Sequence, residues 1–299
     1  MAKGLIDDVK SSLREGGVPF VHLEGDYSFN FAIRKGSAFK AILRVEEDAK
    51  NVSKRDLDEI RKLSVYVNAS PVVVSRKFGE VIFSDDIVYS YRGVNMVSYG
   101  AFKRAIKEGI MPIAISLHGK VYYKTNGEAI AEARRKAGMS LEELSRRTGV
   151  PKRWLSLYES GALVRDVRSL RRLEEELKVP VIARINFLMR RKVINILEKC
   201  KVRDPILRSV AGKLINLGFS VYLPKRAPMD IVATNGKMSI LGGICDRNNF
   251  AEKRKQIREL GRILKAKPLM IVENCPEFAQ EKGVHKLCEF LRTEKLEGI

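Results

Sequence analysis

Twenty residues near the middle of the chain read Leu141-Glu142-Glu143-Leu144-Ser145-Arg146-Arg147-Thr148-Gly149-Val150-Pro151-Lys152-Arg153-Trp154-Leu155-Ser156-Leu157-Tyr158-Glu159-Ser160. Ser145 is small enough to let two helices approach each other, and Gly149 suits a sharp turn that needs positive φ. The positions at inward spacing are apolar: Leu144, Val150, Leu155 and Tyr158. This pattern predicts a helix-turn-helix.

The segments around this motif predict the rest of a small helical bundle. Ser140 and Glu143 form a capping box for the first helix, and Met139 can pack against Leu144 as a hydrophobic staple. Helical periodicity also runs from Glu128 to Ala137 and through Val167, Leu170, Leu173 and Leu177. We therefore expect one helix before the motif and one behind it, which together aim the second motif helix outward.

The motif resembles the signature of Cro/lambda-repressor DNA-binding domains, of the XRE type. The matching blocks are Ser140-Leu141-Glu142-Glu143-Leu144-Ser145, Gly149-Val150-Pro151 and Tyr158-Glu159-Ser160-Gly161. In such domains the second helix enters the major groove of DNA. Its outward positions here are Pro151, Lys152, Arg153, Trp154, Ser156, Leu157 and Ser160. Ser140, Arg146 and Arg147 would contact phosphates and fix the register.

Each outward residue has a chemical role and a plainer alternative. Lys152 or Arg153 can bind guanine O6 and N7, or can belong to a solvated charged face. Trp154 and Leu157 can pack against thymine methyl groups, but Trp154 can equally pack between domains. Pro151 is either the cap or the first residue of the second helix, and the sequence leaves this open.

The two ends of the chain repeat one pattern. Each end has a helix, three strand-like runs, a charged amphipathic helix and an apolar strand. Asn30 and Asp230 stand 200 positions apart, and Pro71 and Pro268 stand 197 apart, so one small gap aligns the two halves. The pattern predicts two copies of an α/β layer domain.

A wider resemblance covers nearly the whole chain. The blocks 28–34, 68–71, 119–122 and 226–230 look like those of archaeal HTH-type transcriptional regulatory proteins. This resemblance implies a transcription regulator whose flanking domains are similar to Holliday-junction-resolvase-like nuclease folds that have lost their chemistry. The expected fold class is α/β plus all-α, with two resolvase-like α/β layer domains flanking a central helix-turn-helix bundle.

Neither repeat keeps the residues of a nuclease site. Such sites hold a metal with an Asp on one strand and Glu-x-Lys on the next. The first repeat has Asn30 at the Asp position and Ala41-Ile42-Leu43-Arg44-Val45 on the next strand. The second repeat keeps Asp230, but its next strand reads Ile240-Leu241-Gly242-Gly243. We therefore expect no enzyme, no metal and no cofactor, with Asp230 as a structural hydrogen-bond acceptor.

Four segments follow from these patterns: a degenerate resolvase-like domain over 1–120, the helix-turn-helix domain over 121–180, a basic amphipathic connecting helix over 181–203, and a second degenerate resolvase-like domain over 204–299. The expected connecting helix has an apolar face with Ile182, Ile185 and Met189. Nine Lys and Arg residues face two acids between Arg184 and Lys213. That basic face can follow a phosphate backbone, or the helix can be a plain core helix.

Charge points to a polyanionic partner. The chain of 299 residues has 56 Lys and Arg against 36 Asp and Glu, a net charge of +20. Nucleic acid is the expected polyanion, and a thermophile's charged surface is the alternative. No long apolar run or signal peptide is apparent, and Cys200, Cys245, Cys275 and Cys288 form no metal-binding pair. We expect a cytoplasmic, nucleoid-associated protein with reduced thiols and no membrane partner.

The sequence thus predicts a sequence-specific double-stranded DNA binder that regulates transcription. A homodimer on a pseudo-palindromic site is expected, because a single motif buries little surface on DNA. A structure-selective nuclease or junction-binding protein and a non-specific nucleoid-associated binder remain alternatives. The operator and any small-molecule effector stay open.

Overall fold

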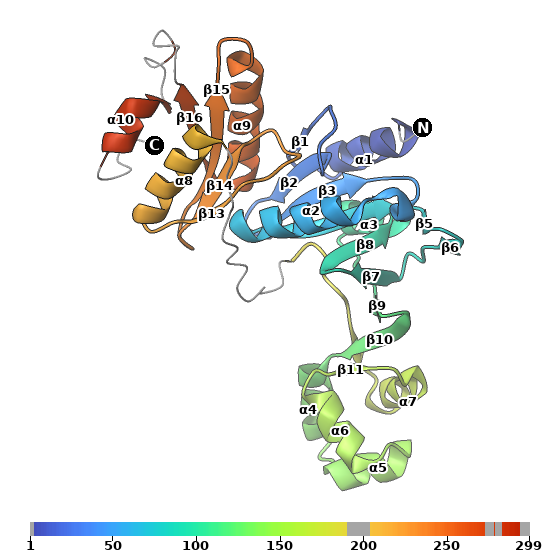
Figure 1. Cartoon of the computed structure of the whole chain (residues 1–299). Helices are drawn as coiled ribbons and strands as arrows, with labels where there is room; N and C mark the ends of the chain where they lie inside the picture. Colours follow the sequence, from blue (N-terminus) through green and yellow to red (C-terminus); the bar gives the residue numbers. More distant parts are fainter. Residues whose placement is uncertain (1–2, 190–203, 273–277, 279–282, 294–299) are drawn as a thin grey trace.

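The computed structural model describes residues 3–189, 204–272, 278 and 283–293. Two α/β units lie side by side, and a helical bundle projects from the first unit on a narrow connection (Figure 1). Within the described residues, no helix is both long and apolar enough to cross a membrane.

The first repeat contains α1 (Lys3–Glu15), β1 (Phe20–His22), β2 (Phe31–Lys35), β3 (Phe39–Val45), the short 3₁₀ helix η1 (Ala49–Asn51), α2 (Lys54–Tyr66) and β4 (Ser70–Ser75). The strands β1, β2 and β3 run antiparallel, and β4 joins β3 in parallel through the crossover helix α2. Leu5, Val9 and Leu13 of α1 are fully buried, as their four-residue spacing predicts.

An extension widens this sheet toward the helical bundle. It contains β5 (Lys77–Phe78), β6 (Val81–Ile82), β7 (Ile87–Tyr91), β8 (Val94–Ser98), α3 (Tyr99–Lys107), β9 (Ala114–Leu117) and β10 (Lys120–Thr125). The strand order is β1-β2-β3-β4-β8-β7-β9-β10-β11, where β11 (Leu163–Val164) comes from the helical bundle. The expected domain boundary at residue 120 falls in the β9–β10 hairpin, and the domain division stays a prediction.

The second repeat contains α8 (Pro205–Asn216), β13 (Ser220–Tyr222), β14 (Ile231–Thr234), β15 (Ser239–Cys245), α9 (Phe250–Leu264), β16 (Lys267–Val272), β17 (Val284–Lys286) and α10 (Leu287–Arg292). Its first three strands are antiparallel and β16 is parallel to β15, as in the first repeat. The Asp204 carboxylate caps α8 by accepting from the Leu207 N–H at 3.0 Å. The repeated order of elements is therefore present in the mixed α/β structure.

The two repeats pack crosswise. Helix α9 of the second repeat contacts β1 and β2 of the first, and α2 of the first repeat contacts β13 and β14 of the second. Apolar side chains from both repeats form one shared core, which includes Phe29, Ile42, Ile60, Val232, Leu241 and Ile257. Burial of this core joins the repeats into one body.

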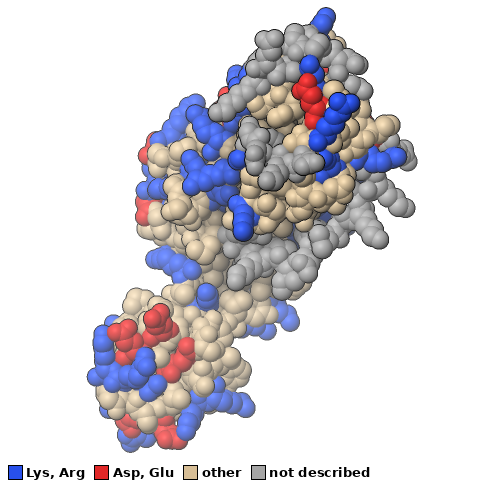
Figure 2. All heavy atoms as spheres, turned by 90° about the vertical axis from the view of Figure 1, so that its left-hand side faces the viewer, with Lys and Arg blue, Asp and Glu red and all other residues tan. Residues whose placement is uncertain are grey.

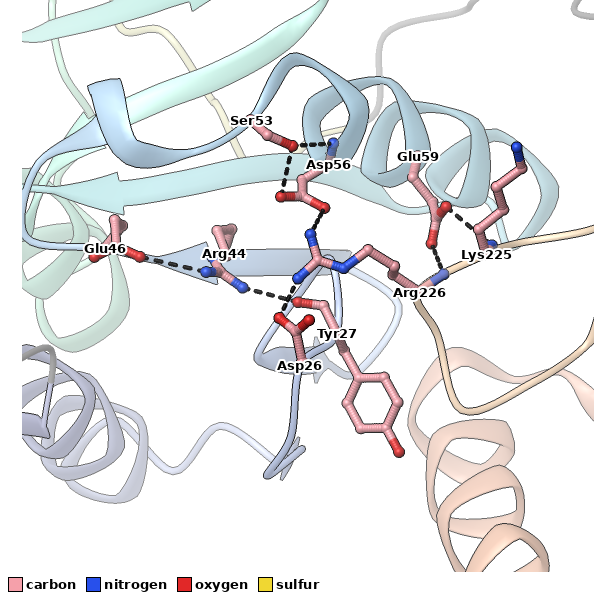
Figure 3. A network of polar contacts seen from close by, with 9 residues as sticks. All are labelled: Asp26, Tyr27, Arg44, Glu46, Ser53, Asp56, Glu59, Lys225 and Arg226. Carbon is pink, nitrogen blue, oxygen red and sulfur yellow. Dashed lines mark hydrogen bonds and ion pairs between the residues drawn. The ribbon is translucent and has the colours of Figure 1, made fainter.

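A polar network closes the same interface (Figure 3). Arg226 of the second repeat donates to Asp56 of α2 at 2.7 Å and also pairs with Asp26. The carboxylate of Glu59 accepts from the backbone N–H groups of Lys225, at 3.0 Å, and Arg226, at 2.7 Å. Asp56 and Glu59 are both buried, so these bonds offset the cost of taking the two carboxylates out of water.

The helical bundle contains α4 (Gly127–Lys136), α5 (Leu141–Thr148), α6 (Lys152–Glu159) and α7 (Val167–Leu177), with the short strands β11 (Leu163–Val164) and β12 (Ile182–Ala183). Both β11 and β12 pair with β10. The chain thus enters and leaves the bundle along the same strand, which fixes the bundle at two points.

The structure corrects the expected connecting helix. Residues 184–189 carry no helix after β12, and residues 190–203 lie outside the described part of the chain. Ile185, Phe187 and Leu188 are buried in the core of the first repeat. The Phe187 carbonyl accepts from Ser70 Oγ at 2.8 Å and from Asn95 Nδ2 at 3.1 Å. The helix predicted over 181–203 is wrong for its first nine residues, because these contacts hold the chain in another conformation.

Candidate nucleic-acid interface

Helix α5 begins and ends as the sequence predicts. The Ser140 hydroxyl accepts from the Glu143 N–H at 3.0 Å, which satisfies one of the free donors of the first turn. Gly149 caps the other end at φ +68°, a left-handed conformation that glycine adopts at little cost. The turn therefore reverses the chain within a few residues and starts α6 at a fixed angle.

Helix α6 is held by its inward side. Leu155 and Tyr158 are buried together with Leu144 and Val150, as expected, and they pack against α4 and α7. Pro151 is the cap residue of α6 rather than its first helical residue. Its side chain makes no capping hydrogen bond, so the start of α6 depends on the preset backbone of proline.

Both ends of α4 contact the end of α6. Arg134 donates from Nε to Glu159 Oε1 at 2.6 Å and from Nη2 to Oε2 at 3.2 Å, and its Nη1 donates to the Met139 carbonyl at 2.8 Å. The hydrogen bonds to the Glu159 carboxylate raise the pKa of Arg134. Gly127 lies against the Glu159 carbonyl, where an added Cβ would stand only 2.2 Å from the oxygen. These contacts fix the orientation of α6 within the bundle.

All predicted outward residues of the second motif helix are exposed. They are Pro151, Lys152, Arg153, Trp154, Ser156, Leu157 and Ser160. Trp154 is 42% exposed and Leu157 is 39% exposed. The interdomain role considered for Trp154 is wrong, because the α5–α6 end of the bundle points away from both repeats (Figure 1). The Arg153 guanidinium lies over the Trp154 ring, 5.5 Å from its centroid.

Three of the cations expected to contact DNA, one at a base and two at phosphates, are paired with carboxylates. Lys152 pairs with Glu142 across the turn. Glu143 accepts from Arg146 at 2.6 Å and from Arg147 at 2.8 Å, and these bonds hold its pKa below the ordinary value of 4.5. Sequence reasoning missed these pairs, although the i,i+3 and i,i+4 spacing of Glu143 to the two arginines was a readable signal.

Asn30 and Asp230, at the positions where nucleases of this kind hold a metal, bind backbone groups. Asn30 Oδ1 accepts from the Val45 N–H at 2.8 Å, and Asp230 Oδ2 accepts from the Ile244 N–H at 2.8 Å. Asp230 also accepts from Lys253 Nζ at 2.7 Å. Among the described residues, no group of three or more His, Cys, Asp or Glu side chains could hold a metal ion.

Two family models match parts of the chain. A helix-turn-helix family model matches residues 130–182. A model of the PD-(D/E)XK superfamily domain matches residues 2–112. No solved structure is a significant match to the chain.

Curated relatives match most of the chain. A protein of Thermococcus gammatolerans is 26% identical over 90% of this chain and 85% of its own length. A relative in Methanocella arvoryzae is 25% identical over 82% and 77% of the two chains, and one in Archaeoglobus fulgidus is 27% identical over 80% and 75%. All three are named "Putative HTH-type transcriptional regulatory protein". With its central helix-turn-helix domain, this chain is a homologue of these archaeal proteins over most of its length.

Proposed function

We propose that this protein is a sequence-specific regulator of transcription that reads the major groove of double-stranded DNA with α6. The observation that carries the proposal is the outer face of α6, which is cationic and aromatic and is exposed at the far end of the bundle (Figure 1). Arg153 or Lys152 would bind guanine, and Trp154 and Leu157 would contact thymine methyl groups. Ser140, Arg146 and Arg147 would bind phosphates.

Selection of bound fragments from a random-sequence duplex pool tests this proposal. The full chain should enrich a defined sequence. Arg153→Ala should then relax the preference at one base pair, with a loss of about 1–3 kcal/mol against the recovered duplex. Arg146→Ala should instead weaken binding to every duplex alike. A uniform loss for both variants would indicate a non-specific nucleoid-associated binder.

The proposed regulator acts as a homodimer. Specific affinity normally needs two half-sites, because one motif contacts few base pairs. Light scattering with and without the recovered duplex measures the state. A monomer under both conditions would remove this part of the proposal.

A structure-selective nuclease is the second candidate, and the match to the PD-(D/E)XK superfamily domain favours it. We propose a non-enzyme, because Asn30 stands at the Asp position of the first repeat and the next strand, residues 41–45, contains no carboxylate and no lysine for metal-dependent hydrolysis. The assay is cleavage of four-way junctions with magnesium or manganese. Cleavage that disappears in Asp230→Ala would establish the nuclease instead.

A further inference from the structure

Helix α9 carries a row of cations on its outer side. The helix lies between the two sheets and contacts β15 and β16 on one side and β1 and β2 on the other. Its remaining side exposes Lys255, Arg258 and Arg262, and Lys265 follows at the C-cap. Their spacing of three, four and three residues places them along one face. Figure 2 shows Lys and Arg side chains gathered on the upper lobe, which contains the second repeat.

The first repeat provides an internal comparison for this row. Ile60 and Leu63 of α2 correspond to Ile257 and Leu260 of α9, at the same offset of 197 that relates Pro71 to Pro268. A residue in the left-handed conformation also follows each helix. It is Asn68, with φ 54°, after α2 and Lys265, with φ 51°, after α9. At the four positions of the row, α2 has Asp58, Arg61, Val65 and Asn68. The shared fold therefore does not require cations on this face.

Structural ion pairs do not account for Lys255, Arg262 and Lys265, three of the four cations in the row. Asp58 in α2 pairs with Arg92 at 3.1 Å. Within the described part of the chain, no ion pair is made by Lys255, Arg262 or Lys265.

The length of the row suits a nucleic-acid backbone. Ten residues separate Lys255 from Lys265, which corresponds to about 15 Å along a helix. One DNA strand presents on the order of four phosphates over that length. The helix-turn-helix region from Glu128 to Lys178 contributes only 12 cations against nine acids to a chain of net charge +20. Most of the positive charge therefore lies outside the bundle.

We infer that the outer face of α9 is a second DNA contact, which binds the phosphate backbone without reading sequence. This inference rests on the proposed function. It gives the paired α/β repeats a role in holding the DNA backbone by electrostatic attraction. The cations form a regular row on a helix that lies between two sheets. A DNA backbone has phosphates at regular spacing, so it fits this row better than an acidic protein of unspecified shape does. Because both neighbouring sheets hold α9, the backbone of this helix needs no further ordering when DNA binds.

The test uses the triple variant Lys255→Gln, Arg262→Gln and Lys265→Asn in the full chain. Asn stands at the equivalent left-handed position in α2, so the variant should fold, which circular dichroism and urea unfolding check. Affinity for the duplex recovered by selection and for a scrambled duplex is measured over a range of salt concentrations. The matched control removes three cations from other surfaces, with Lys103→Gln, Lys120→Gln and Lys237→Gln.

We expect the triple variant to bind both duplexes more weakly with an unchanged ratio between them. The slope of log affinity against log salt should fall by about 0.9 per lost phosphate contact, or roughly 2.7 in total, while the control keeps the wild-type slope. An unchanged slope, or an equal fall in the control, overturns the contact on α9. Failure of the proposed function is distinguishable, because the wild-type chain would then show no preference between the two duplexes.

Discussion

Asn30 and Asp230 are structural equivalents, and each side chain accepts a hydrogen bond at 2.8 Å from the backbone of the neighbouring strand. An amide in one repeat and a carboxylate in the other thus perform the same task. Only Asp230 has a cationic partner, Lys253, at 2.7 Å. The position that a metal-dependent nuclease would use for its ligand ties two strands together in both repeats.

The first prediction concerns Asp230. Asp230→Ala should lower the free energy of unfolding by about 1–3 kcal/mol, because the Ile244 N–H and Lys253 lose their acceptor. Asp230→Asn should cost less than about 1 kcal/mol, since an amide serves at Asn30 and the pair with Lys253 is partly solvated. Urea unfolding measures both. Equal losses in the two variants would show that the charge, rather than the backbone contact, is the stabilising feature.

The second prediction concerns the carboxylate that pairs with Lys152. Glu142→Gln should raise affinity for DNA up to about fivefold at low salt, because the neutral side chain no longer competes with phosphate for Lys152 and an exposed ion pair is weak. The hydrogen bond from Lys152 also lowers the pKa of Glu142, so this carboxylate remains a competitor under mildly acidic conditions. Fluorescence anisotropy measures the change.

Glu132→Gln is the matched control for this prediction. Glu132 pairs with Lys136 at 2.8 Å on α4, outside the α5–α6 motif. The control variant should bind DNA like the wild-type chain. Equal gains in both variants would point to net charge rather than to release of Lys152.

The third prediction compares two glycines. Gly149→Ala should cost about 1–2 kcal/mol, because alanine is strained at φ +68° but the nearest atom to an added Cβ is 3.7 Å away. Gly127→Ala should cost about 3 kcal/mol and weaken DNA binding as well, because its Cβ would collide with the backbone of Glu159 at the end of α6. Thermal unfolding and DNA titration measure the two effects. A smaller loss for Gly127→Ala than for Gly149→Ala would contradict the close approach of α4 and α6.

The fourth prediction concerns pH. Burial lowers the pKa of His285, whose buried Nε2 has no hydrogen-bond partner among the residues that the structure describes. The unfolded chain therefore binds a proton more readily than the folded chain, so stability is full above the ordinary His pKa and falls as pH drops below it. Urea unfolding from about pH 7.5 to about pH 5.5 should show this loss.

Replacement of the imidazole tests its cause. His285→Gln should flatten this part of the pH profile. The exposed His118 lies in a turn at φ 50°, so His118→Asn suits the backbone and should leave the profile as it is in the wild-type chain. A profile that remains steep in His285→Gln would assign the pH dependence to another group.

The helix-turn-helix was readable from the sequence because its determinants are local. Gly149, Leu155 and Tyr158 lie within ten residues of one another, and a helical period with a turn glycine specifies their positions without distant partners. The caps at Ser140 and Asp204 depend on neighbours three residues away. Comparison of the chain with itself was likewise enough to find the two repeats.

The tertiary structure alone decided features that join distant residues. The crosswise packing of α2 and α9, the burial of Phe187 against Ser70, and the contact of Gly127 with Glu159 each depend on where the chain travels between the partners. Apolar positions such as Ile185, Phe187 and Leu188 fit a helix face as well as an irregular buried segment, because periodicity records which side chains avoid water and not what they pack against. The sequence therefore determined the local elements and the similarity of the two repeats. Long-range packing decided how the repeats join and which side of α9 stays exposed.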